Sequence, residues 1–167
     1  MKRSSSQLNT LALSLIMVFS AIQANAQFDP SEYSTLDFEL HKNLIIVNAH
    51  INEKPAKFIV DTGASISLLD KSQYKRYEFK YSVSTDERLT GFGGKSRLMK
   101  TSSVKFKLDG FDLAATYRFN ASDLGDLNVA LSDTNQRVLG ILGSDFLKNY
   151  HAIIDYEKQK IYVKFLY

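Results

Sequence analysis

The sequence predicts an all-β domain with one or two short helices, and three observations support this fold class. Apolar residues recur at every second position far more often than at helical spacing, most clearly in Val104–Leu108. Turn residues separate the alternating runs, as in segment 52–55 and at Asp109-Gly110. The chain of 167 residues has no internal repeat and no low-complexity linker, which suits a single domain.

Each element is predicted from these signals in chain order. The predicted hairpins pair 44–51 with 56–60, 84–90 with 96–101, 104–108 with 111–119, and 151–156 with 160–165. Asp70 is expected to cap a short helix that ends at Tyr74 or Tyr77, and Ser144 to Leu147 resemble a second helix start. Residues 121–134 are polar with spaced leucines, which predicts a loop with some helix.

Residues 1–26 are predicted to be a secretory signal peptide and are excluded from the fold. Lys2 and Arg3 form its positive start, residues 11–22 its mostly apolar core, and Ala24-Asn25-Ala26 its cleavage site. A membrane anchor is disfavoured, because the apolar stretch is shorter than the ~20 residues of a spanning helix. The mature protein is expected to be periplasmic or secreted, with an N-terminal segment over 27–35 and the folded domain over 36–167.

Composition narrows the function of the mature chain. Removing residues 1–26 takes two of the 21 basic residues and none of the 18 acidic ones, so the net charge falls from +3 to near +1. No basic stripe remains that would indicate a nucleic-acid partner. The absence of cysteine excludes disulfides, thiolate zinc sites and cysteine nucleophiles. His41, His50 and His151 lack metal-ligand spacing and are expected to be satisfied strand residues, so neither a metal nor a cofactor is predicted.

The most informative segment is Asp61-Thr62-Gly63-Ala64-Ser65. It follows the apolar run 58–60 and precedes the alternating run 66–69. An apolar strand that ends in a carboxylate and then turns on a glycine places an acid at the mouth of a β-fold. A carboxylate in this position is not expected to serve only as a surface charge, so Asp61 is the candidate catalytic group.

Three segments together resemble the single-domain, retropepsin-like aspartic proteases and their bacterial relatives. They are Phe58-Ile59-Val60-Asp61-Thr62-Gly63-Ala64-Ser65, the glycine hairpin Leu89-Thr90-Gly91-Phe92-Gly93-Gly94, and Ile141-Leu142-Gly143-Ser144-Asp145-Phe146-Leu147. The resemblance covers residues 36–165 and implies half of a closed β-barrel, the acid protease fold. A lone Asp-Thr-Gly is a weak signal, but an apolar strand before it and Ile-Leu-Gly about 80 residues later make it specific.

Aspartic proteolysis needs two carboxylates that share one proton, and this chain offers one. One carboxylate takes a proton from a water held between them, while its protonated partner hydrogen-bonds the peptide carbonyl. Asp133-Thr134-Asn135 is the nearest second candidate, but it lacks the glycine and follows no apolar run. A symmetric homodimer would bring Asp61 to its own copy across a twofold axis.

The resemblance implies roles for the neighbouring residues. Thr62 would hold the two turns together across the dimer axis, Gly63 would allow the tight backbone, and the Ser65 hydroxyl would help orient Asp61; Ala64 completes the turn. Gly91, Phe92, Gly93 and Gly94 would form a flap over an extended polypeptide. Ile141, Leu142 and Gly143 would lie beneath the catalytic loop as scaffold.

The sequence therefore predicts an exported aspartic endopeptidase that acts on polypeptides as a homodimer, without a stable membrane anchor after signal cleavage. The alternative hypothesis is a protein of the same fold that binds a peptide or a protein partner without cutting it.

Overall fold

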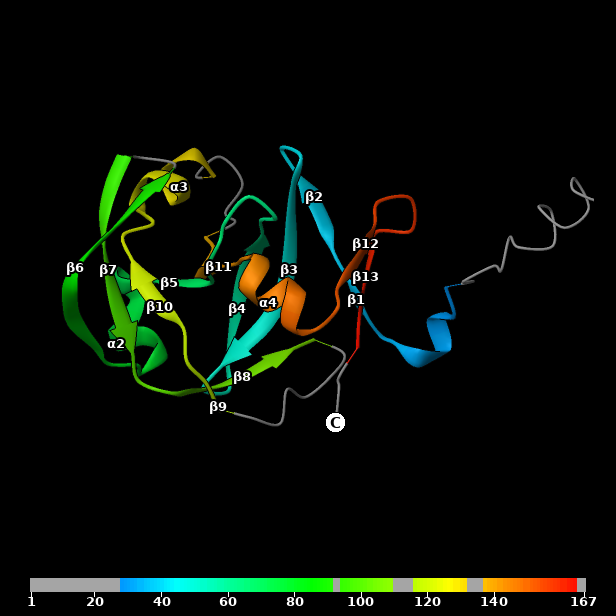
Figure 1. Cartoon of the computed structure of the whole chain (residues 1–167), viewed down its shortest axis with the longest axis horizontal. Helices are drawn as coiled ribbons and strands as arrows, with labels where there is room; N and C mark the ends of the chain where they lie inside the picture. Colours follow the sequence, from blue (N-terminus) through cyan, green and yellow to red (C-terminus); the bar gives the residue numbers. More distant parts are fainter. Residues whose placement is uncertain (1–27, 92–93, 110–115, 132–136, 165–167) are drawn as a thin grey trace, which may run out of the picture.

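The computed structural model describes residues 28–91, 94–109, 116–131 and 137–164, with the backbone alone described for 83–91 and 94–96. Strands dominate this part of the chain, which confirms the all-β fold class (Figure 1). Three short α-helices accompany them, one more than the upper limit that the sequence predicted: α2 (Tyr74–Tyr77), α3 (Gly125–Ala130) and α4 (Ser144–Asn149). The additional one is α3, which lies in the segment expected to be a loop with some helix.

Two 3₁₀-helices, η1 (Pro30–Glu32) and η2 (Lys71–Gln73), complete the helical part of the described residues. The Asp70 side chain caps η2 by accepting a hydrogen bond from the Ser72 amide, and α2 follows directly, as the sequence predicted. The strands are β1 (Ser34–Asp37), β2 (Glu39–His41), β3 (Leu44–Ile51), β4 (Lys54–Val60), β5 (Leu68–Asp70), β6 (Tyr81–Gly91), β7 (Gly94–Thr101), β8 (Val104–Leu108), β9 (Thr116–Tyr117), β10 (Asn120–Ser122), β11 (Gly140–Leu142), β12 (Ile153–Asp155) and β13 (Lys160–Val163).

The larger sheet contains ten strands and curls around the core. Its order is β6-β7-β10-β5-β11-β4-β3-β8-β9, and β2 adds to β3. β11 lies between the two strands that flank Asp61: it runs parallel to β4 and antiparallel to β5. Residues near 60 and near 140 are therefore neighbours in space, although about 80 residues separate them in the chain.

The smaller sheet contains β1, β13 and β12 and joins the two ends of the described chain (Figure 1). β12 and β13 form the predicted terminal hairpin. β1 pairs with β13 from Ser34 opposite Val163 to Asp37 opposite Lys160, so the smaller sheet includes the last two residues of the predicted N-terminal segment 27–35. The Lys160 ammonium lies 2.6 Å from an Asp37 oxygen and closes this sheet with an exposed ion pair.

The predicted hairpins are present, but two of them differ from the prediction in the extent of their strands. Asn52 and Glu53 have φ of 48° and 69° and form a two-residue turn, so β4 begins at Lys54 and not at residue 56. β8 pairs with β9 at only two positions and extends its pairing along β3. Residues 110–115, between β8 and β9, lie outside the described residues.

A cluster of aromatic rings fills the space enclosed by the larger sheet. Phe58, Phe106, Phe119 and Phe146 are each at most 2 % exposed. Phe106 touches the other three, with ring centroids 5.2–6.0 Å apart. Phe58 comes from the strand that leads to Asp61 and Phe146 from α4, so this packing fixes both elements relative to each other.

Candidate active site

Asp61 follows β4 directly and lies where the buried strand reaches the surface. Ile59 and Val60 are buried, whereas Asp61 is exposed. The Asp61 amide donates a hydrogen bond of 3.0 Å to the Leu142 carbonyl, which extends the β4–β11 pairing by one residue. Burial of the apolar strand thus holds the backbone of Asp61 in place while its carboxylate faces solvent.

A tight turn holds the carboxylate. Asp61 Oδ1 accepts a hydrogen bond of 2.8 Å from the Gly63 amide, and the Asp61 carbonyl accepts one of 3.2 Å from the Ala64 amide. Within the described residues, Asp61 makes no ion pair. Thr62 is exposed beside it. Among the described residues, the Ser65 hydroxyl makes no hydrogen bond to Asp61, and the Gly63 amide holds this carboxylate. A role of Ser65 in orienting Asp61 stays a prediction.

Gly143 lies beneath this loop, in contact with its backbone. A Cβ added at Gly143 would stand 2.7 Å from the Ile66 carbonyl oxygen and 2.8 Å from that of Ala64. The next amide, that of Ser144, donates a hydrogen bond of 2.7 Å to the Ala64 carbonyl. Leu142 is buried beside it, and Ile141 is half-buried. Only glycine permits so close an approach of the two chain segments.

Asp145 supports the same loop, a role that the sequence analysis did not assign to it. Its Oδ2 accepts from the Ser67 amide at 3.0 Å, and its Oδ1 accepts from the Ser67 hydroxyl at 2.7 Å and from the Phe146 amide at 2.7 Å. The Ser67 hydroxyl oxygen in turn accepts from the Gly143 amide at 3.0 Å. Asp145 lies two residues after the Ile-Leu-Gly motif, at the start of a helix, and this position is the sequence signal that could have indicated its supporting role.

Tyr117 extends this polar group beneath the loop. Burial, followed by the negative charge of Asp145, raises the pKa of the Tyr117 phenol to about 12. Both effects disfavour the phenolate. Tyr117 therefore stays neutral at ordinary pH, and its ring packs against Phe119 and Phe146 of the aromatic cluster.

The predicted flap corresponds to the hairpin of β6 and β7. Gly91 pairs with Gly94 at its closed end, whereas Phe92 and Gly93 lie outside the described residues. In Figure 1 the closed end of this hairpin points to the upper edge of the view, and its open end lies low, near α2. The backbone thus supplies a glycine-ended hairpin, as the sequence predicted; its closure over a substrate stays a prediction.

The histidines behave differently from the expectation of satisfied strand residues. His41 Nε2 is buried without a hydrogen-bond partner among the described residues. His50 Nδ1 lies 3.2 Å from Asp109 Oδ1, but outside hydrogen-bond geometry. His151 follows α4 with a φ of 46° and is not in a strand. Across the described ranges, no three His, Asp or Glu side chains gather in a way that would hold a metal ion.

No helix in the described part of the chain combines the length and apolar character needed to cross a membrane. The predicted signal peptide lies outside the described residues.

Comparison with known proteins gives one family and several structures. The family described as "Aspartyl protease" matches residues 47–146, which contain Asp61, the glycine hairpin and Asp145. A search of curated proteins finds no match.

Three solved structures are similar to the chain. The EIAV protease in complex with the inhibitor HBY-793 has 23% identity and a TM-score of 0.46, over 64% of this chain and 88% of that one. The retroviral protease-like domain of Ddi1 from Leishmania major has 21% identity and a TM-score of 0.49, over 74% and 94%. A retropepsin-like aspartic protease from Rickettsia conorii has 20% identity and a TM-score of 0.47, over 80% and 94%.

Proposed function

Because the chain belongs to the aspartyl protease family, we propose that it is an exported endopeptidase that cleaves polypeptides with a water activated by Asp61. The observation that carries this proposal is the placement of Asp61. Its backbone is fixed by the Leu142 carbonyl, and its carboxylate is exposed and held by the Gly63 amide. A general base must be immobile and must also be open to substrate, and this arrangement supports both requirements.

The second carboxylate would come from a second copy of the chain. Two carboxylates about 3 Å apart cannot both ionise, so the pair would share one proton. The ionised member takes a proton from the bound water, which attacks the peptide carbonyl. The protonated member donates a hydrogen bond to the carbonyl oxygen, and a proton then passes to the leaving nitrogen. An exposed Asp61 on one chain is compatible with such pairing.

The surrounding residues have defined tasks in this proposal. Thr62 is exposed next to Asp61, where it would contact the partner's turn. The hairpin closed by Gly91 and Gly94 would fold over an extended substrate and exclude water. Gly143 and Asp145 would keep the loop in its catalytic shape from below.

A subunit-mixing experiment tests the proposal. Wild type and Asp61→Asn are incubated together at equal concentration, and cleavage of an unfolded protein substrate is measured at constant total protein. Random exchange leaves about one quarter of the dimers with two aspartates, so activity should fall to about a quarter of that of pure wild type. A decrease to only about one half, in samples where a tagged copy shows that the subunits have exchanged, would mean that each chain works alone.

The control variant is Glu157→Gln, which removes an exposed charge in the turn between β12 and β13. Its mixtures should keep full activity. The mass in solution, measured at the same concentrations, should be that of a dimer. A monomer without pepstatin-sensitive cleavage would instead favour the alternative function, in which the protein binds a peptide or a partner without cutting it.

Export is a separate part of the proposal. Mass spectrometry of the protein purified from its source should give a mature N-terminus at Gln27. An intact Met1 would contradict export.

A further inference from the structure

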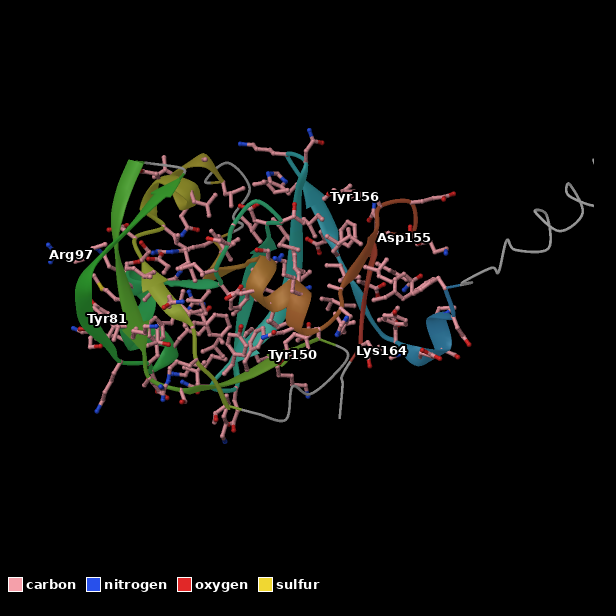
Figure 2. The ribbon with its side chains drawn as sticks, viewed as in Figure 1. Tyr81, Arg97, Tyr150, Asp155, Tyr156 and Lys164 are labelled. Atoms are coloured by element: carbon pink, nitrogen blue, oxygen red, sulfur yellow. The ribbon has the colours of Figure 1, made fainter. Side chains whose placement is uncertain are left out.

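The open end of the β6–β7 hairpin carries a cleft that the proposed active site does not use. This open cleft has a volume of about 470 Å³ and is bordered by residues 80–82 at the start of β6, residues 100–102 at the end of β7, and Arg118. In Figure 2, Tyr81 marks the place on the lower left, far across the view from Asp155 and Tyr156 of the small sheet. Tyr81 pairs with Thr101 at one end of the hairpin and Gly91 with Gly94 at the other. Seven positions of β7 separate Thr101 from Gly94, so at ~3.3 Å per residue the cleft lies roughly 23 Å from the hairpin's closed end.

Hydrogen bonds hold the three chain segments of the cleft together. The Lys80 amide donates to the Ser102 hydroxyl at 3.1 Å, and the Ser102 amide donates to the Lys80 carbonyl at 2.8 Å. The amide and the hydroxyl of Thr101 both donate to the Phe119 carbonyl, at 3.2 and 2.8 Å. Arg118 is therefore held beside β7 by its neighbour in the chain. The floor of the cleft is preformed and needs no ligand to order it.

The register of the sheet directs polar side chains to this face. Lys100 lies opposite Ser82 of β6 and opposite Asn120 of β10. Directly paired residues point to the same side of a sheet, so these three side chains share one face. Lys100 and Ser82 are exposed, whereas Met99 beside them in β7 is buried in the core. The alternation of β7 thus separates a cationic outer face from an apolar inner one.

The cleft has an excess of positive charge. Lys80, Lys100 and Arg118 line it, and no acidic residue appears among its described walls. Over the described ranges, none of the three cations forms an ion pair, although nine ion pairs occur elsewhere in the same ranges. Arg118 is exposed, as are Lys80 and Lys100, and its guanidinium donates no hydrogen bond to the described part of the protein. The Arg118 guanidinium and the ammonium groups of Lys80 and Lys100 offer only hydrogen-bond donors and positive charge, and this combination favours an anionic acceptor.

We propose that this cleft binds a small molecule or headgroup that carries a phosphate-type oxyanion. The guanidinium would hold two oxygens of the anion, the two ammonium groups would neutralise its charge, and the Ser82 hydroxyl would add a hydrogen bond. The volume exceeds that of one phosphate group and falls in the range of ~300–1,000 Å³ typical of small-molecule sites.

Calorimetric titration of the full-length mature protein with pyrophosphate, at constant ionic strength set with chloride, tests this assignment. Wild type should show saturable binding of one ligand per chain. Arg118→Gln and Lys100→Gln should each weaken binding about tenfold. Lys148→Gln removes an exposed charge on α4 and should leave the affinity unchanged. Thermal melts of each variant show whether it is folded.

Two results would overturn the assignment: no saturable binding by folded wild type, or an equal loss in Lys148→Gln and Arg118→Gln. Flotation with phosphatidylcholine vesicles, with and without phosphatidic acid, separates the two sources of the anion. Binding to the acidic vesicles that is lost in Arg118→Gln assigns the site to a lipid headgroup, whereas pyrophosphate binding without flotation assigns it to a soluble ligand. Because the readout is binding, its result does not depend on whether the protein cleaves peptides.

Discussion

Asp61 and Asp70 stand nine positions apart and have the same local structure, yet they occupy opposite environments. Each follows or ends a strand, and each accepts a hydrogen bond from the amide two residues later, at 2.8 Å from Gly63 and at 3.0 Å from Ser72. The Asp61 amide donates to the carbonyl of Leu142, the last residue of β11, and the Asp70 amide donates to that of Leu139, just before β11. The local turn therefore does not distinguish a candidate catalytic aspartate from a structural one.

The difference lies in what surrounds each carboxylate. Asp61 is exposed, whereas Asp70 is 1% exposed and its Oδ2 accepts from the Gln73 and Asn128 side-chain amides, both at 3.3 Å. The Arg137 guanidinium lies 3.9 Å from the same oxygen. Protein donors hold both carboxylate oxygens of Asp70, so this buried side chain joins α3 to the strand region and is closed off from a substrate. Asp61 keeps free acceptor positions for a water or a second carboxylate.

The largest expected difference between the two aspartates is in catalysis. Asp61→Asn should lower kcat/KM for peptide cleavage by about 10²–10⁴-fold, because the general base is lost. Its free energy of unfolding should change by less than about 0.5 kcal/mol, since the side chain is exposed. Initial rates and urea unfolding measure the two quantities. Full activity of this variant would remove Asp61 from the mechanism.

For the free energy of unfolding, substitution of Asp70 should have the larger effect and substitution of Asp61 the smaller one. Asp70→Ala should lower the free energy of unfolding by about 2–3 kcal/mol, because buried Gln73 and the partly buried donors of Ser72 and Asn128 lose their acceptor. Asp61→Ala is the matched control and should be nearly neutral. Urea titrations of both variants test the contrast, and equal losses would show that exposure does not separate the two positions.

The loop of Asp61 depends on close backbone contact, and substitutions of Gly143 and Gly63 test this dependence. Gly143→Ala should cost about 2 kcal/mol, because its Cβ would meet fixed carbonyl groups at 2.7 and 2.8 Å. Gly63→Ala should cost less than about 1 kcal/mol, since its Cβ would meet only the movable Asp61 carboxylate at 3.2 Å. Thermal unfolding ranks the two variants; the reverse order would contradict the described packing.

A smaller effect is expected where Asp145 holds Ser67. Asp145→Asn and Ser67→Ala should each cost about 1–2 kcal/mol, and the double variant should cost less than their sum by about 1 kcal/mol. Both should lower kcat more than they raise KM, because they displace the loop and not the substrate. Additive free energies would show that the two side chains do not act together.

The smallest expected effect depends on pH. The folded protein raises the pKa of Tyr117 from 10.0 to about 12, so the unfolded chain loses this proton first as pH rises. The contribution of Tyr117 to stability is therefore complete below pH 10 and is lost as pH rises from 10 towards 12. Tyr117→Phe should show a shallower loss of stability than wild type over this interval, measured by urea unfolding at several alkaline pH values. Identical slopes would argue against a protected phenol.

Local patterns in the sequence were sufficient for most of the fold. Alternation predicted β8 and the hairpins, and the cap residue Asp70 predicted the start of η2. Local patterns do not predict contacts between distant parts of the chain. The pairing of β1 with β13 joins residues more than 120 positions apart, and no short-range signal encodes it. The hydrogen bond from the Gly63 amide to Asp61 depends on the shape of the folded loop, which sequence spacing does not specify.

The sequence by itself determined that an apolar strand delivers Asp61 to a glycine turn, since burial and backbone freedom are properties of the residues concerned. It also determined that one chain carries one such aspartate. Only the tertiary structure decided which of two similar turns stays open. β11 brings Gly143 and Asp145 beneath the first, while α3 and η2 close over the second. The physical reason is that a carboxylate's environment is set by side chains from distant segments, and these meet only when the sheet has formed.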